Sequence, residues 1–85
     1  DEAESVTVDV SIMDMAFVSS ELTINAGDTV VWTNNDMMEH SIIVDGETSD
    51  VLETGETFDY KFELPGTYEY VCGIHSEMTG TITVL

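Results

Sequence analysis

The chain has 85 residues, 42% of them hydrophobic, and carries a formal net charge of −17 at pH 7. This length and composition predict one folded domain with a single modest core. Eighteen acidic residues stand against one basic residue, Lys61, which argues against binding to nucleic acids or anionic lipid surfaces because both would be repelled. No apolar run approaches the length of a membrane-spanning helix.

Short apolar and β-branched segments, separated by turn residues, run through the whole chain, and helical periodicity is not evident. The strands that this pattern predicts cover, in chain order, residues 6–13, 22–24, 29–33, 41–44, 57–64, 67–72 and 80–85. Residues 47–54 are mostly polar and are expected to be irregular or an edge strand. Seven or eight short strands at this spacing indicate an all-β fold, a Greek-key β-sandwich. Residues 1–5 are expected to be a solvated tail or linker remnant before a domain over residues 6–85.

Three finer expectations concern packing. A bulge or bend is expected near Asp14, where the alternation changes phase. Met13 and Met15, on either side of it, are expected in the core rather than among metal ligands. Alternate residues of the 57–64 segment are expected to share one face of a strand, namely Phe58, Tyr60, Phe62 and Leu64.

The only cysteine, Cys72, ends the expected strand 67–72, and His75 and Met78 follow at intervals of three residues. Cys72 and His75 cannot share one face of a continuous strand, because side chains alternate with period two. The chain must therefore turn at Gly73, and the loop that follows can bring Cys72, His75 and Met78 around a common point.

His40 is the only other histidine, and it lies at the end of an expected loop over residues 34–40. Loops of a β-sandwich cluster at its two ends, so this loop and the one over 73–79 can share an end. Thiolate, imidazole and thioether groups are ligands that copper accepts. The alternatives are that Cys72 is a small buried hydrophobe, that His40 is an ordinary polar residue and that Met78 only packs. The spacing of the four side chains favours a copper site.

The combined pattern resembles the cupredoxins, which are small type 1 (blue) copper proteins. The residues that carry this resemblance are Trp32-Thr33-Asn34 with His40 downstream, Phe58-x-Tyr60-x-Phe62, and Pro65-Gly66-x-Tyr68-x-Tyr70-x-Cys72-x-x-His75. The short Cys-x-x-His-x-x-Met spacing is most similar to that of amicyanin-like members. The resemblance covers residues 6–85, essentially the whole domain.

The resemblance implies one copper ion per chain and a role for each matching residue. His40 and His75 resemble the two imidazole ligands, Cys72 the thiolate and Met78 the weak axial thioether. Asn34 resembles the asparagine that ties the two ligand loops together through hydrogen bonds.

Two further expectations concern the surface and the fold. His75 is the expected electron exit, and the residues around it are expected either to form an apolar electron-transfer surface or to pack in the core: Met37, Met38 and Ile74. Tyr68 resembles the tyrosine-corner residue of Greek-key domains.

The function implied is that of a one-electron carrier between a donor and an acceptor redox protein. It is expected to be a monomer that works outside the cytoplasm, in the periplasm, at the cell surface or as a secreted protein. Under this interpretation it is not an enzyme. The acidic composition has two interpretations: a solvated surface adapted to a high-salt environment, or steering toward a basic redox partner.

Two other functions remain open. The first is a redox enzyme that acts on a small inorganic molecule, such as nitric oxide, at an open copper site. Its only hint is that Glu39 and Ser76 occupy positions where amicyanin-like proteins usually carry proline. The second is a copper storage or delivery module, which predicts Cu(I) affinity without a reversible reduction potential.

Overall fold

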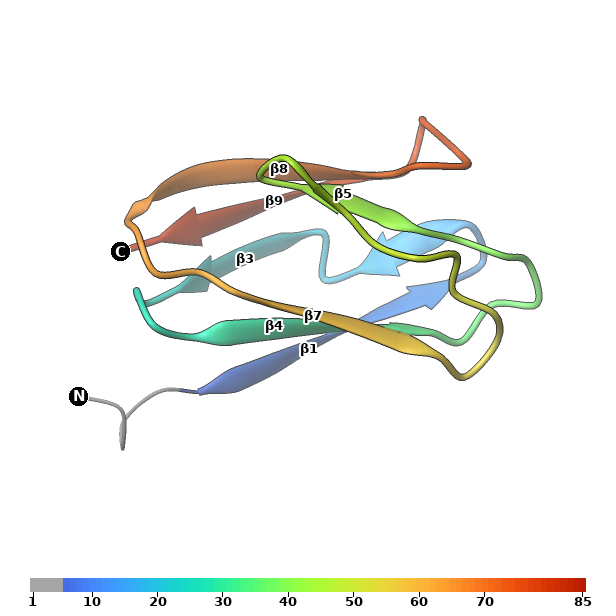
Figure 1. The fold of residues 1–85 in the computed structure, drawn as a ribbon, viewed down its shortest axis with the longest axis horizontal. Coiled ribbons are helices and arrows are strands. Elements are labelled where there is room, and N and C mark those ends of the chain that lie inside the picture. Colours follow the sequence, from blue (N-terminus) through green and yellow to red (C-terminus); the bar gives the residue numbers. More distant parts are fainter. Residues whose placement is uncertain (1–5) are drawn as a thin grey trace.

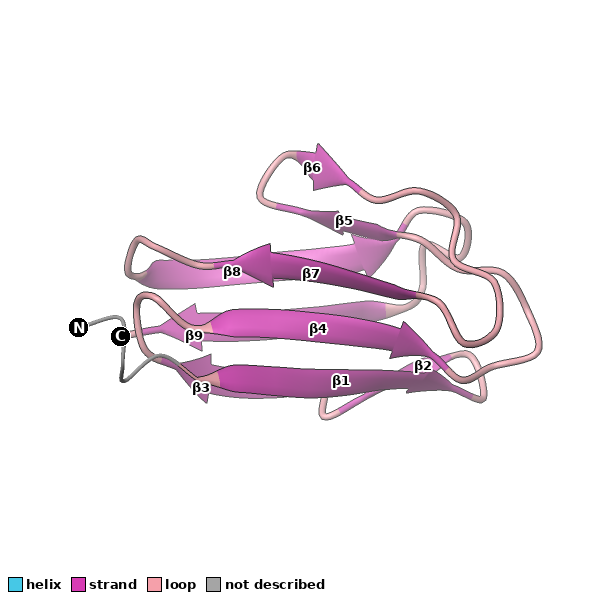
Figure 2. Ribbon diagram, turned by 60° about the horizontal axis from the view of Figure 1, so that its bottom comes forward, coloured by secondary structure: helices cyan, strands magenta, loops and turns pink. Residues whose placement is uncertain are grey.

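Two β-sheets pack face to face in the computed structural model, which describes residues 6–85 (Figures 1 and 2). The tail expected over residues 1–5 lies outside the described residues. One sheet has the strand order β2-β1-β4-β7 and the other β3-β9-β8-β5-β6. The strands are β1 (Thr7–Met13), β2 (Ala16–Val18), β3 (Glu21–Ile24), β4 (Thr29–Asn34), β5 (Ile42–Val44), β6 (Glu47–Thr48), β7 (Thr57–Lys61), β8 (Gly66–Cys72) and β9 (Thr79–Val84).

The chain crosses between the sheets, so two pairs of neighbouring strands are parallel. β1 pairs with β4 and β3 pairs with β9 in this way, whereas β4–β7, β5–β8 and β8–β9 are antiparallel. Figure 1 shows β5, β8 and β9 above β1, β4 and β7. This all-β sandwich confirms the expected fold class.

Alternation along β4 and β8 determines which residues face the core. β4 buries every second residue, ending with Asn34, and β8 buries Tyr70 and Cys72 near its end. Both strands run toward the end of the sandwich that lies opposite the C-terminus in Figure 1. The loops that follow them therefore leave the sandwich at a common end.

Aromatic side chains from both sheets fill the centre of the core. The Trp32 and Tyr70 rings meet edge to face with centroids 5.1 Å apart, and Phe17 meets Tyr70 in the same way at 4.7 Å. Such pairs contribute about 0.5–1.5 kcal/mol beyond the area that they bury. Tyr70 lies two residues before Cys72 on the same face of β8, so this packing anchors the strand that carries the cysteine.

The described residues form nine strands rather than the expected seven or eight. The additional strands, β2 and β6, have three and two residues and were too short to show alternation. Near Asp14, where a bulge or bend is expected, the chain makes a tight turn, in which Asp14 and Met15 both have positive φ, 53° and 60°. This turn pairs β1 with β2 as a hairpin.

Two packing expectations were wrong. Met13 and Met15 are 47% and 41% exposed, because Met13 lies on the opposite face of β1 from the buried Ile12 and Met15 lies in the turn. Leu64 is 71% exposed, because β7 ends at Lys61 and the alternation that buries Phe62 does not continue. The Tyr68 hydroxyl donates a hydrogen bond to the Leu64 carbonyl at 2.7 Å, the contact expected of a tyrosine corner.

Candidate metal centre

Three side chains with metal-ligating atoms meet at the loop-bearing end of the sandwich. His40, Cys72 and His75 each offer one such atom, and these atoms lie within 4.8 Å of one another. Cys72 Sγ lies 3.5 Å from His40 Nδ1 and 3.8 Å from His75 Nδ1, and the two Nδ1 atoms are 3.3 Å apart. His40 and Cys72 are buried, whereas His75 is partly exposed. His40 thus lies beside two residues that are 32 and 35 positions away along the chain.

The backbone of His40 is held by an isolated antiparallel bridge to Leu52. The His40 N–H donates to the Leu52 carbonyl at 3.1 Å, and the Leu52 N–H donates to the His40 carbonyl at 2.6 Å. The buried amide of Asn34 reinforces this bridge, since its Nδ2 donates to the Leu52 carbonyl at 2.8 Å and to the Met38 carbonyl at 2.9 Å. His40 therefore enters the site from a fixed segment, although it lies outside a regular strand.

Asn34 does not connect the two loops in the way expected of it. Its amide nitrogen donates both hydrogens to the carbonyls of Met38 and Leu52, and neither residue belongs to the loop after Cys72. The link between the ligand loops is instead a hydrogen bond from the Gly73 N–H to the Ser41 carbonyl at 3.2 Å. A Cβ atom on Gly73 would lie 2.5 Å from Ser41 Oγ, so a larger residue here would require the Ser41 side chain to move.

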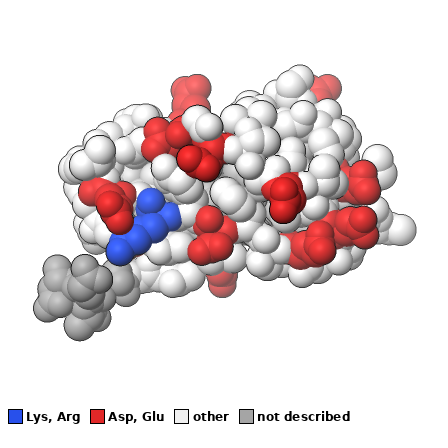
Figure 3. Space-filling view, in the orientation of Figure 1, with Lys and Arg blue, Asp and Glu red and all other residues white. Residues whose placement is uncertain are grey.

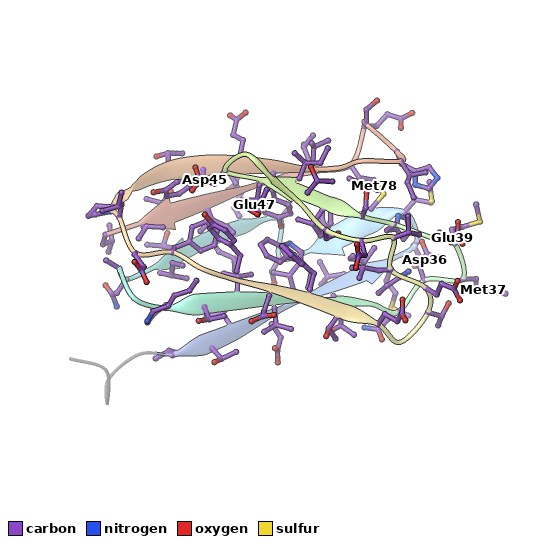
Figure 4. All side chains as sticks on the ribbon, viewed as in Figure 1. Asp36, Met37, Glu39, Asp45, Glu47 and Met78 are labelled. Atoms are coloured by element: carbon purple, nitrogen blue, oxygen red, sulfur yellow. The ribbon has the colours of Figure 1, made fainter. Side chains whose placement is uncertain are left out.

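The loop from Cys72 to Met78 is closed by its own hydrogen bonds. The Cys72 N–H donates to the Met78 carbonyl at 3.0 Å, and the Met78 N–H donates to the His75 carbonyl at 3.0 Å. The His75 N–H points at Cys72 Sγ, 3.4 Å away. Met78 is buried. Figure 4 shows it in the half of the molecule that holds Asp36 and away from Asp45 and Glu47.

The surroundings of Cys72 favour its thiolate form. Burial raises the pKa of the thiol, but hydrogen bonds from the backbone of Ser41, Ile74 and His75 outweigh it. Together they lower the pKa of Cys72 from 9.0 to about 6. The thiolate is the form of cysteine that binds metals.

Asp36 completes the surroundings of His40, and sequence analysis did not single it out. His40 Nε2 lies 2.9 Å from Asp36 Oδ2, and because an ionised carboxylate only accepts hydrogen bonds, Nε2 is the donor. This hydrogen bond is the main cause that holds the pKa of Asp36 below its ordinary value. The sequence signal for Asp36 was its position four residues before the expected ligand His40. This signal does not stand out, because carboxylates are abundant in this chain.

The residues expected around His75 are on the surface, so their interpretation as core residues was wrong. Met37 is 92% exposed, Met38 52% and Ile74 46%. Figure 4 shows Met37 at the outermost point of this end of the molecule. Acidic side chains are spread over the face drawn in Figure 3 rather than gathered in one patch.

The donor set fits copper. Two imidazole nitrogens and one low-pKa thiolate within 4.8 Å match the His₂Cys set of blue copper sites, in which a methionine is the weak additional ligand. The buried Met78, hydrogen-bonded through its backbone to both Cys72 and His75, is available for that position.

Comparisons with known proteins agree with this chemistry. Residues 4–85 match the family described as copper binding proteins, plastocyanin/azurin family. The chain is 36% identical over 90 residues to amicyanin-alpha of Methylorubrum extorquens, a match that covers 98% of this chain and 76% of that protein. It is 38% identical over 85 residues to a plastocyanin of Scenedesmus fuscus, covering 82% of this chain and 87% of that protein.

Solved structures of similar proteins have the same fold. A reduced amicyanin variant superposes with a TM-score of 0.88 at 27% identity, covering 93% of this chain and 82% of the other. A purple cupredoxin from Nitrosopumilus maritimus superposes with a TM-score of 0.86 at 29% identity, covering 92% of this chain and 99% of the other. The chain therefore belongs to the plastocyanin/azurin family of copper-binding proteins, and it is a cupredoxin, a one-electron carrier whose cofactor is copper.

Proposed function

We propose that this cupredoxin transfers electrons between two redox proteins through one copper ion held by four side chains. His40 and His75 supply their Nδ1 atoms, Cys72 supplies its thiolate and Met78 a weaker thioether ligand. The convergence of three donor atoms within 4.8 Å is the observation that carries this assignment. Copper, when bound, supplies a one-electron couple between Cu(I) and Cu(II).

The protein's part is to hold the ligands in nearly one arrangement for both oxidation states. Cys72 is the last residue of β8, and His40 is held by its bridge to Leu52. Ligands on rigid elements keep their positions better than ligands on free loops. The hydrogen bonds within the 72–78 segment extend this rigidity to His75 and Met78. When the ligands move little between the two oxidation states, electron transfer is faster.

We propose His75 as the electron exit. Its Nδ1 atom faces Cys72, so the opposite edge of the imidazole ring points away from the site, and the residue is partly exposed whereas His40 is not. The exposed side chains of Met37, Met38 and Ile74 offer an apolar electron-transfer surface at this end. Asn34 acts behind the ligands by holding the segment that leads to His40.

We propose redox partners with basic surfaces, a monomeric carrier and an extracytoplasmic location. The net charge of −17 supports the first, and the resemblance to cupredoxins supports the others. Residues 6–85 contain no helix that is long and apolar enough to span a membrane. A salt series tests steering, because the screening length falls to about 3 Å at 1 M salt. Electron-transfer rates with a basic acceptor should fall steeply with salt, and a flat series would favour salt adaptation instead.

The experiment that tests the copper site is a titration of reduced, metal-free protein with Cu(II). Visible absorption and electron paramagnetic resonance should show an intense thiolate-to-copper band that saturates at one copper per chain. The band should be absent in Cys72→Ala and retained in Asn35→Ala, whose side chain is exposed and donates to Ser11 Oγ. Loose binding without the band would overturn the assignment.

Two further measurements distinguish the carrier from the other functions. Reversible voltammetry supports a carrier, whereas Cu(I) affinity without a reversible potential would indicate storage or delivery. Spectral inertness to azide and nitric oxide is expected, and a shift on adding either would indicate an open site and an enzyme.

A further inference from the structure

Asp36 connects the buried imidazole of His40 to a distant turn of the chain. Its Oδ2 atom accepts hydrogen bonds from His40 Nε2 at 2.9 Å and from the Met15 N–H at 3.0 Å. Its Oδ1 atom accepts one from the Met37 N–H at 2.8 Å. Figure 4 shows Asp36 at the end of the molecule where Met78 and Met37 lie.

The position of this carboxylate is determined from several sides. The Asp36 N–H donates to Asn34 Oδ1 at 2.8 Å, and the Thr54 hydroxyl donates to the Asp36 carbonyl at 2.6 Å. The turn between β1 and β2 presents the Met15 N–H through a residue with a φ of 60°. The side chains of His40 and Asp36 are 0% and 12% exposed, so water has little access to the hydrogen bond between them.

This contact determines which nitrogen of His40 carries the proton. With Nε2 donating to a carboxylate, the neutral ring keeps its free lone pair on Nδ1. Nδ1 is the atom that lies 3.5 Å from Cys72 Sγ and 3.3 Å from His75 Nδ1. A carboxylate on the far side of the ring also raises the basicity of the ligand. A more basic imidazole ligand stabilises Cu(II), the more highly charged copper ion, more than it stabilises Cu(I).

The second imidazole lacks such a partner. Among residues 6–85, the hydrogen bonds of the His75 ring do not include a carboxylate, and its Nδ1 faces only Cys72 and His40. The two histidines are thus held differently: one by a buried carboxylate, the other by the loop that carries it.

We propose that Asp36 is a positioning residue that holds His40 as the Nε2–H tautomer and, through the charge on its carboxylate, favours Cu(II) over Cu(I) and so lowers the reduction potential. This inference rests on the proposed function, because it takes His40 to be a ligand. The hydrogen bond between Asp36 and His40 does not itself involve the metal, so its positioning effect and its effect on the metal can be tested separately.

The first test uses metal-free protein. Nitrogen-15 NMR of the imidazoles at pH 8 reports the tautomer of His40 in the wild type, Asp36→Asn and Asp36→Ala. Asparagine keeps an acceptor oxygen without the charge, so its Nε2–H tautomer should persist, whereas alanine should give a mixture of tautomers. An unchanged His40 spectrum in a folded Asp36→Ala protein would overturn the positioning role.

The second test uses copper-loaded protein and voltammetry. Loss of an outer partner of a metal ligand typically costs about 10–100-fold in metal affinity. If Asp36→Asn weakens Cu(II) binding about tenfold relative to Cu(I), the potential rises by about 59 mV, the value of a tenfold change for one electron.

The matched control is Glu39→Gln, which removes one exposed carboxylate beside His40. It should change the potential much less than Asp36→Asn. Equal rises in both variants would overturn the inference, because they would reflect surface charge alone. A wild-type protein without a thiolate-to-copper band would overturn the proposed function, while the metal-free NMR comparison would still decide whether Asp36 positions His40.

Discussion

The main-chain N–H of Cys72 donates to the carbonyl of Met78 at 3.0 Å, so the first and last proposed ligands of the loop are hydrogen-bonded neighbours. This bond closes a seven-residue segment and sets how far His75 can lie from Cys72. The Cys72-x-x-His75-x-x-Met78 motif thus supplies the proposed ligands, and its spacing also constrains the conformation of the loop.

Met78→Leu tests the thioether ligand. Leucine has a similar volume, and such exchanges in a core usually cost less than about 1.5 kcal/mol, so the fold should persist. Losing the donor should weaken Cu(II) binding more than Cu(I) binding, because the more highly charged ion gains more from each donor. The reduction potential should rise and the copper hyperfine splitting should change. Unaltered spectra and potential would show that Met78 only packs.

Gly73→Ala tests the close approach of the two ligand loops. The added Cβ would meet Ser41 Oγ at 2.5 Å, and overpacking of this kind costs about 1–3 kcal/mol. Urea unfolding of the metal-free protein should show this loss. The double variant Gly73→Ala with Ser41→Ala lacks the Ser41 hydroxyl, so it should recover part of the lost free energy of unfolding. Equal stability of the single variant and the wild type would contradict the predicted clash.

Asn34→Ala should destabilise the protein by about 1–3 kcal/mol, because it removes a buried amide that donates to the Met38 and Leu52 carbonyls and accepts from the Asp36 N–H. Urea unfolding measures the loss. Asn35→Ala is the matched control, since Asn35 is exposed and its side-chain amide donates to Ser11 Oγ at 2.7 Å in an exposed hydrogen bond. A similar loss in both variants would show that the Asn34 hydrogen bonds are not the cause.

The metal-free protein should show a pH dependence that belongs to Cys72. Its pKa is about 6 in the folded state against an ordinary value of 9.0. A lowered pKa contributes stability that is fully present above pH 9 and is lost as the pH falls toward 6. The free energy of unfolding should therefore rise between pH 6 and 9 more in the wild type than in Cys72→Ser.

Cys72→Ser retains both histidines, so the difference between the two proteins isolates the thiol. The ultraviolet absorption of the thiolate should titrate with a midpoint near the pKa of about 6. A midpoint near 9 would show that the hydrogen bonds from Ser41, Ile74 and His75 do not outweigh burial.

The local part of this architecture was readable in the sequence. Side-chain alternation depends only on the extended backbone, so the positions of the longer strands, such as 29–33 and 67–72, agree with β4 and β8. The spacing of Cys72, His75 and Met78 is local in the same sense. One turn at Gly73 suffices to bring them to one end of the sandwich.

The partners of His40 depended on the tertiary structure. Leu52, which pairs with His40, lies 12 residues away along the chain, and Met15, which donates to Asp36, lies 21 residues before that aspartate. Alternation carries no information on which loops meet. The same holds for the exposure of Met13, Met15 and Leu64, because burial depends on what the opposite sheet places over a residue.

The sequence by itself determined the class of fold, the donor types and the family, since strand alternation and ligand spacing are short-range properties of the chain. The tertiary structure alone decided that Asp36 holds the buried imidazole of His40, that Asn34 bonds to Leu52, and that Gly73 joins the ligand loops. The physical reason is that the contacts of Asn34 and Gly73 join segments that only the packing of two sheets and their loops brings together. Asp36 lies in the same loop as His40, but its position depends on Met15 and Thr54, which come from other segments.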